Sequence, residues 1–139
     1  NSVPTVISDN TICNFYGTEE TEEITVVGAT SITKGFPVSG EYGEDAFEIS
    51  VHGENGFSEK YIMKNGVDFT TAYTLLGSSR INPVAKNATI FAKFSYDKNF
   101  ENYIVNKIDI KLSSKVKITE VVITSLGRGY DLLIYGIYV

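Results

Sequence analysis

Two short stretches of the sequence place tyrosine beside charged side chains that could bind a polyhydroxylated ligand. Arg128, Tyr130 and Asp131 fall in one turn between apolar segments, and Tyr42 lies in a second polar stretch. Exposed aromatic rings stack on sugar rings, while nearby Arg, Asp and Asn side chains hydrogen-bond to hydroxyl groups. We therefore predict a ligand-binding role for Tyr42, Arg128, Tyr130 and Asp131. The alternative is that many of the nine tyrosines only cover the edge of the core, and the absence of tryptophan favours it.

Acidic residues around Tyr42 could supply oxygen ligands to calcium. The candidates are Glu41, Glu44 and Asp45, and a second acidic run spans residues 19–23. Calcium takes six to eight hard oxygen ligands, often from loops. No EF-hand spacing is present, and a solvated acidic loop is the alternative interpretation of both groups. Calcium is the one cofactor that the sequence suggests.

Catalytic chemistry is not indicated by the remaining reactive side chains. His52 is the only histidine and falls on the polar face of an alternating stretch, so we interpret it as a surface residue. Cys13 has no cationic neighbour in sequence and is predicted to be a small buried hydrophobe. No nucleophile-elbow motif occurs, and nothing indicates two carboxylates facing each other across a cleft. We predict that the chain is not an enzyme.

Length and charge exclude several classes of partner. The chain has 139 residues and a net charge of −5, with its basic residues spread singly, so we expect no nucleic acid partner. It has no apolar run long enough to span a membrane and no signal peptide, so we expect no membrane insertion. One cysteine allows neither an internal disulfide nor a cysteine-coordinated zinc site. We expect one domain, 1–139, excised from or terminal in a larger protein that is secreted, on a cell surface or in a virion. The match of residues 87–89 to the N-glycosylation pattern is weak support for the secreted location.

The elements that must position these residues are predicted to be strands. Tyr, Phe, Ile, Val and Thr dominate, and glycines punctuate the chain at short intervals. We expect strands around 2–16, broken at Asp9-Asn10, with Pro4 placing the first on an edge. A meander is predicted over 46–76, with a hairpin turn at Asn65-Gly66, because both of these residues tolerate positive φ. Residues 30–43 and 77–87 are expected to be loops.

Two later stretches are predicted to be strands with one apolar face. In 88–96 the residues expected to face inward are the even-numbered ones, from Ala88 through Ile90 to Tyr96. In 104–112 the even-numbered residues again face inward, while Val105 faces outward. Asn106 falls on the apolar side and needs a hydrogen-bond partner there.

The last 24 residues contain two long apolar segments separated by the turn at 127–131. Buried parity switches between Val116 and Ile123, which predicts a β-bulge near Thr119-Glu120. The final segment, 132–139, is apolar on both faces and is expected to be covered on both. The pattern predicts an antiparallel β-sandwich or jelly roll of roughly eight to ten strands with no substantial helix.

Two functions follow from this architecture, and the sequence does not decide between them. The chain resembles, at the level of architecture, the jelly-roll modules that serve bacterial enzymes as carbohydrate-binding accessories. The first hypothesis is therefore a non-catalytic module that binds a glycan or a cell-surface receptor. The chain also resembles the terminal heads of phage fibres. The second hypothesis is a trimerising, receptor-binding or folding-helper C-terminal domain of a phage tail spike or another surface fibre, with the final strand at the trimer axis.

Overall fold

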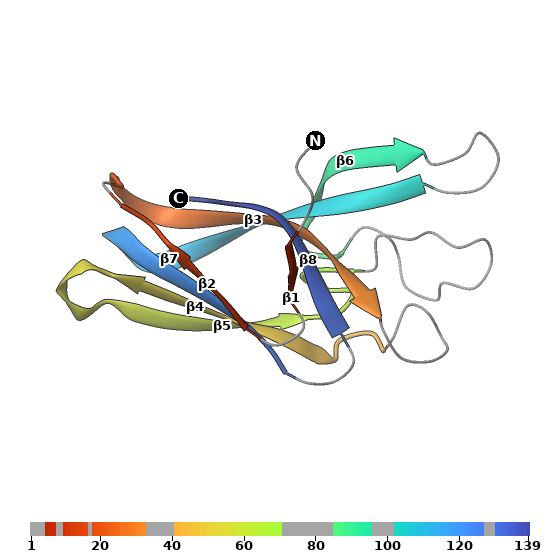
Figure 1. The fold of residues 1–139 in the computed structure, drawn as a ribbon, viewed down its shortest axis with the longest axis horizontal. Coiled ribbons are helices and arrows are strands. Elements are labelled where there is room, and N and C mark those ends of the chain that lie inside the picture. The colour runs from red at the N-terminus through yellow and green to blue at the C-terminus, as the bar shows by residue number, and fades with distance from the viewer. Residues whose placement is uncertain are drawn as a thin grey trace.

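The computed structural model describes residues 5–7, 10–16, 18–32, 41–70, 85–95, 102–126 and 130–139 (Figure 1). In chain order the elements are β1 (Thr5–Ile7), β2 (Asn10–Asn14), β3 (Glu20–Ile32), β4 (Asp45–Gly53), the 3₁₀ turn η1 (Glu54–Gly56), β5 (Ser58–Lys64), β6 (Thr89–Ser95), β7 (Asn102–Ser125) and β8 (Tyr130–Tyr138). Every strand pair is antiparallel, and the described residues contain no α-helix. The predicted antiparallel all-β class is therefore confirmed, whereas the sandwich or jelly-roll arrangement stays a prediction.

The strands form one sheet that is organised along β7. Its main order is β1-β8-β3-β7-β4-β5, and β2 and β6 also pair with β7. The first part of β7 pairs with β3 and β6, and we name β1, β8, β3, β6 and this part of β7 the β3 half-sheet. The last part, from Ile118, pairs with β2 and β4, and with β2, β4 and β5 it forms the β4 half-sheet. Because β1 and β5 end the order without pairing to each other, the sheet is not closed.

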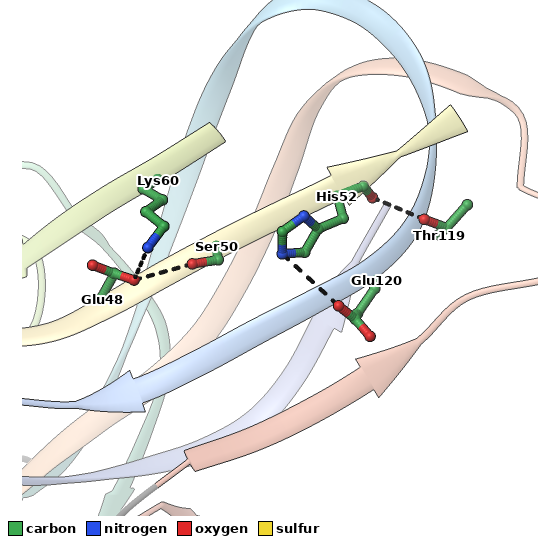
Figure 2. A network of polar contacts seen from close by, with 6 residues as sticks. All are labelled: Glu48, Ser50, His52, Lys60, Thr119 and Glu120. Atoms are coloured by element: carbon green, nitrogen blue, oxygen red, sulfur yellow. Dashed lines mark hydrogen bonds and ion pairs between the residues drawn. The ribbon is translucent and has the colours of Figure 1, made fainter. Parts of the chain in front are cut away.

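A bulge in β7 accompanies the passage from one half-sheet to the other. His52 lies opposite Glu120, but the next residue, Gly53, lies opposite Ile118, so Thr119 is one extra residue on β7. Ile118 and Val121 are both buried although they are three positions apart. β7 curves back on itself just before Thr119 (Figure 2). The bulge predicted at Thr119-Glu120 is confirmed.

The core draws residues from both half-sheets. Its members include Ile24 and Val26 of β3, Phe47, Ile49 and Val51 of β4, Ile108 and Ile110 of the first part of β7, and Ile118, Val121 and Ile123 of the last part. Inward and outward residues alternate along β4, where Glu48, Ser50 and His52 point away from this core. The predicted polar position of His52 is therefore confirmed.

The predicted meander over 46–76 is correct for its first two strands. β4 and β5 form a hairpin through η1, in which Asn55 has φ +58° and Gly56 has φ +76°. The predicted third strand, from Val67, is wrong in its described part. Residues 66–68 form a turn in which the Asp68 amide donates to the Lys64 carbonyl at 2.9 Å. Asn65-Gly66 thus begins a local turn rather than a hairpin. Residues 71–76 lie outside the described residues.

Other expected boundaries and faces need correction. β3 continues to Ile32, so residues 30–32 of the predicted loop are strand, and residues 33–40 lie outside the described residues. Ile90 is 42% exposed although it was expected to face inward, because β6 pairs with β7 on one side and has a register shift at Ile90. Val105 is buried rather than outward. Asn106 is fully buried, and its side-chain oxygen accepts the Ala85 amide at 3.1 Å, as its position required.

Two short strands form in the N-terminal stretch, as predicted. Asn10 belongs to β2 rather than to the predicted break, and residue 9 lies outside the described residues. β1 ends the sheet order, as expected for a strand that follows Pro4. β2 does not continue β1, because it pairs with β7 whereas β1 pairs with β8.

The final strand is less covered than expected. β8 pairs with β3 and β1, and not with β7. Its register with β3 shifts so that Tyr135 is an extra residue, which turns both Ile134 and Ile137 toward the core. This bulge explains part of the apolar pattern on both faces. Tyr138 is 55% exposed and Val139 is 41% exposed, so the prediction of full cover on both faces is wrong for the end of β8.

Candidate functional site

One end of the molecule gathers most of the residues that the sequence singled out. The Leu126 amide donates to the Ala46 carbonyl at 3.1 Å, so the end of β7 lies beside the start of β4. Tyr130, at the start of β8, lies opposite Ile32, at the end of β3. Figure 1 shows the starts of β4 and β8 and the end of β3 close together. We name this region the loop end, comprising residues 41–46, 64–70, 85–88, 126 and 130–131.

The turn that carries Tyr42 is fixed by hydrogen bonds to Asn65. The Gly43 amide donates to the Asn65 carbonyl at 2.8 Å, and the Asn65 amide donates to the Glu44 carbonyl at 2.9 Å. The Asn65 side-chain amide also donates to the Glu41 carbonyl at 3.1 Å. Gly43 has φ +80°, which favours glycine. Tyr42 is 61% exposed at the tip of this braced turn, so its ring is accessible to a ligand.

Asp68 joins two other segments of the loop end. Its carboxylate accepts the Lys64 amide at 2.8 Å and the Asn87 side-chain amide at 3.2 Å. The backbone amide of Asn87 donates to the Val67 carbonyl at 2.7 Å, which aligns residues 85–88 with the turn after β5. Asn87 is exposed despite these bonds. The loop end is therefore a connected polar surface rather than a set of separate loops.

The predicted calcium ligands are neighbours in the same turn, but their contacts are with protein groups. The Asp45 carboxylate forms an ion pair with the Lys64 ammonium group across the β4–β5 hairpin. Glu41 contributes its backbone carbonyl to the bond from Asn65. In the described part of the chain, no three His, Cys, Asp or Glu side chains lie together as a metal site would require. Calcium binding by Glu41, Glu44 and Asp45 stays a prediction.

The other predicted ligand-binding residues are located only in part. Arg128 lies outside the described residues. Tyr130 and Asp131 are the first residues of β8, and their backbones pair with Ile32 and Ser31 of β3. The structure thus brings the backbones of Tyr130 and Asp131 to the same end as Tyr42, as the binding hypothesis requires.

A second group of polar contacts joins side chains of β4, β5 and β7 in the β4 half-sheet (Figure 2). Lys60 forms an ion pair with Glu48 at 3.1 Å, and the Ser50 hydroxyl donates to the same carboxylate at 3.2 Å. The hydrogen bond from Lys60 lowers the pKa of Glu48 below its ordinary value. His52 Nε2 lies 3.8 Å from the Glu120 carboxylate. The Lys60–Glu48 and His52–Glu120 pairs are cross-strand pairs that hold adjacent strands in register, whereas Ser50 and Glu48 lie on the same strand.

A polar clamp near the curve of β7 was missed by sequence reasoning. The Glu59 carboxylate accepts the Ser113 amide at 3.2 Å and the Tyr61 hydroxyl, and the Tyr61 hydroxyl also lies 3.3 Å from the Lys111 carbonyl. Burial, then the neighbouring Glu59, raises the pKa of Tyr61. The hydrogen bonds from Ser113 and Tyr61 lower the pKa of Glu59. No sequence signal connects residues 59 and 113, because the contact depends on how β7 curves.

Cys13 is half-buried on β2, and burial raises the pKa of its thiol. A raised pKa leaves less of the nucleophilic thiolate at neutral pH. This environment agrees with a packing role rather than with a reactive one.

No protein family, curated protein or solved structure that was compared with this chain matches it. Within the described residues, no helix has the length and hydropathy needed to cross a membrane. The function must therefore be argued from the surfaces described above.

Proposed function

We propose that this chain is a non-catalytic module that binds a carbohydrate or a cell-surface receptor through its loop end. The observation that carries the proposal is the exposed ring of Tyr42 on a turn braced by Asn65. A fixed aromatic ring can stack on a sugar without losing much conformational entropy when the ligand binds.

Polar groups around the ring suit hydroxyl recognition. Glu41, Lys64, Lys86 and Asn87 are all exposed at the loop end, and together they supply both hydrogen-bond donors and acceptors. The start of β8 would add Tyr130 and Asp131 from the adjoining strand. The chemistry favours a neutral or mixed-charge glycan over nucleic acid, because the chain carries a net charge of −5.

Binding to a glycan array by wild type and by Tyr42→Ala and Tyr130→Ala tests this proposal. We expect each variant to bind its best glycan roughly tenfold more weakly or worse, since a factor of ten corresponds to about 1.4 kcal/mol. Tyr16→Ala is the matched control, because Tyr16 is 89% exposed and lies beside the curve of β7, remote from the loop end. Far-UV circular dichroism establishes that each variant is folded.

Three array results would contradict the proposal: no binding to any glycan, unchanged binding by Tyr42→Ala, or an equal loss in Tyr16→Ala. Repeating the array with calcium and with a chelator examines the calcium prediction separately. Binding that requires calcium would indicate that Asp45 leaves Lys64 to join Glu41 and Glu44 as a ligand.

A second function is favoured by the exposed end of β8. Tyr138 and Val139 are large apolar residues at the end of an apolar strand, and a trimer would cover them. This is the arrangement expected of a trimerising or folding-helper domain of a phage tail spike or surface fibre. Sedimentation of the chain would show a trimer that Tyr138→Lys dissociates. A monomer at high concentration would exclude this function.

Both functions suit a two-layer β-sandwich of the jelly-roll type, in which the two half-sheets are the layers. The support is that core residues of β3, β4 and both parts of β7 belong to one cluster. Both functions also place the parent protein outside the cell, on its surface or in a virion.

A further inference from the structure

β2 and β5 are the two outer strands of the β4 half-sheet, and the open edge of β2 differs from that of β5. β2 pairs with β7 on one side, and no strand in the described part of the chain pairs with its other side. At the opposite edge, β5 carries Glu59, Lys60 and Lys64, and charges of this kind discourage pairing between edges. β2 has the sequence Asn-Thr-Ile-Cys-Asn, which contains no charge and no proline.

The backbone of β2 offers hydrogen-bonding groups to a further strand. The Phe15 amide donates to the Thr119 carbonyl at 2.9 Å, which continues the register of Asn14 opposite Glu120. Successive residues of a strand direct their N–H and C=O groups to opposite edges. The odd-numbered residues of β2 therefore bond to β7, while Asn10, Ile12 and Asn14 direct theirs away from it.

The sequence of β2 is complementary to itself in antiparallel register. With Ile12 on a two-fold axis, Asn10 faces the partner's Asn14, Thr11 faces the partner's Cys13, and Ile12 faces the partner's Ile12. The even-numbered residues, whose backbone groups point to the open edge, pair with one another. Asn10 with the partner's Asn14, Ile12 with the partner's Ile12 and Asn14 with the partner's Asn10 can therefore exchange hydrogen bonds, while Thr11 and the partner's Cys13 form non-hydrogen-bonded pairs. No like charges meet, and Ile12, which is 56% exposed, gains an apolar neighbour.

We propose that two copies of this chain form a homodimer by pairing β2 with β2 across a two-fold axis at Ile12. The two β4 half-sheets then become one continuous sheet. An interface of this kind is isologous, so each copy contributes the same patch. Because only five residues pair on each side, the interface is small and we expect weak association. The turn that carries Tyr42 lies on the β4–β5 side of the last part of β7, whereas β2 pairs with the other side, so the dimer would present two such sites.

Sedimentation equilibrium over a concentration series reaching the millimolar range tests the dimer. Wild type is expected to form a dimer, whereas Ile12→Lys, which places a like charge pair on the axis, is expected to stay monomeric. Ile62→Lys is the matched control, because Ile62 is 41% exposed on the outer face of β5 and should leave the dimer unchanged. A wild type that stays monomeric, or a dimer that survives Ile12→Lys, overturns the inference.

Disulfide trapping tests the register. Ile12→Cys in a Cys13→Ser background puts two thiols directly opposite each other, within the usual Cα separation of a disulfide. We expect rapid covalent dimer formation on mild oxidation. Thr11→Cys in the same background places its thiol opposite position 13 of the partner, where the serine substitution leaves no thiol, and should cross-link slowly. Equal cross-linking of the two variants, or a trimer that Ile12→Lys does not alter, contradicts the proposed pairing without bearing on glycan binding at Tyr42.

Discussion

Single side chains in this protein act mainly by completing hydrogen bonds where the sheet changes direction. Glu59 is the clearest case, because its carboxylate accepts the Ser113 amide and the Tyr61 hydroxyl beside the curve of β7. Backbone amides that lose a partner strand otherwise depend on water. Glu59 and Tyr61 thus tie β5 to the middle of β7.

The lowered pKa of Glu59 predicts how stability depends on pH. A carboxylate whose pKa is depressed by folding contributes stability above its ordinary pKa and loses that contribution as the pH falls through the depressed value. Glu59→Gln should therefore be less stable than wild type at neutral pH, and the difference should shrink as the pH falls below about 4.5. Urea denaturation midpoints from about pH 6 to about pH 3 measure this.

Glu48 also has a lowered pKa, but it is present in both wild type and Glu59→Gln. Its contribution to stability therefore cancels from the difference between the two. A difference between wild type and Glu59→Gln that stays constant over the whole range would contradict the proposed role of the charged carboxylate.

At the scale of elements, the bulge at Thr119 lets β7 keep both Ile118 and Val121 inward although they are three positions apart. Deleting Thr119 leaves these two residues two positions apart, so regular alternation keeps Val121 and Ile123 inward and leaves their pairing with β2 and β4 unchanged. We therefore expect the deletion variant to fold, with a urea denaturation midpoint close to that of Thr119→Ala.

Thr119→Ala is the control for this deletion, because it keeps the length of β7. It removes only the hydroxyl bond to the His52 carbonyl, and its cost should be about 1 kcal/mol or less. A deletion variant that is far less stable than Thr119→Ala, or that does not fold, would show that Thr119 is not the single extra residue of β7.

Sequence patterns predicted strands correctly where one face of the strand is buried and the other is exposed to solvent. Alternation in 46–52 identified the buried face of β4, and the parity switch after Val116 located the bulge. Asn106 was recognised as needing a partner, although Ala85 could not be named. The prediction that Ile90 faces inward was wrong. The even-numbered residues of β6 have the pattern of a buried face, but β6 lies at the margin of the sheet.

Strand pairing was beyond the sequence because it joins residues far apart in the chain. Nothing in 130–138 indicates that β8 pairs with β3 and β1 rather than with β7. At the candidate site, the sequence named Tyr42 as a candidate but did not decide whether its ring is exposed, because an aromatic residue in a polar stretch can also cover the edge of the core. The Asp45–Lys64 ion pair was missed, although counting back from the turn at 54–56 would have placed these two residues close to each other across the hairpin.

At the scale of the whole molecule, β7 holds the two half-sheets together, and the three surfaces proposed for binding or assembly lie on different strands. The loop end carries Tyr42, the open edge of β2 carries Ile12, and the end of β8 carries Tyr138. Since β7 contributes to both half-sheets, an error in its register would misplace all three surfaces. The central claim is therefore the pairing of β7 on both sides of its bulge.

Nuclear Overhauser effects between α-protons test that pairing most directly, because they are strong between the non-hydrogen-bonded pairs of antiparallel strands. The structure predicts such contacts between Val51 and Val121, between Ile49 and Ile123, and between Ile12 and Val122. Observing all three contacts would support the pairing of β7 with β2 and β4 after the bulge. Contacts displaced by one residue along β7, or α-proton shifts typical of helix in 102–125, would contradict it.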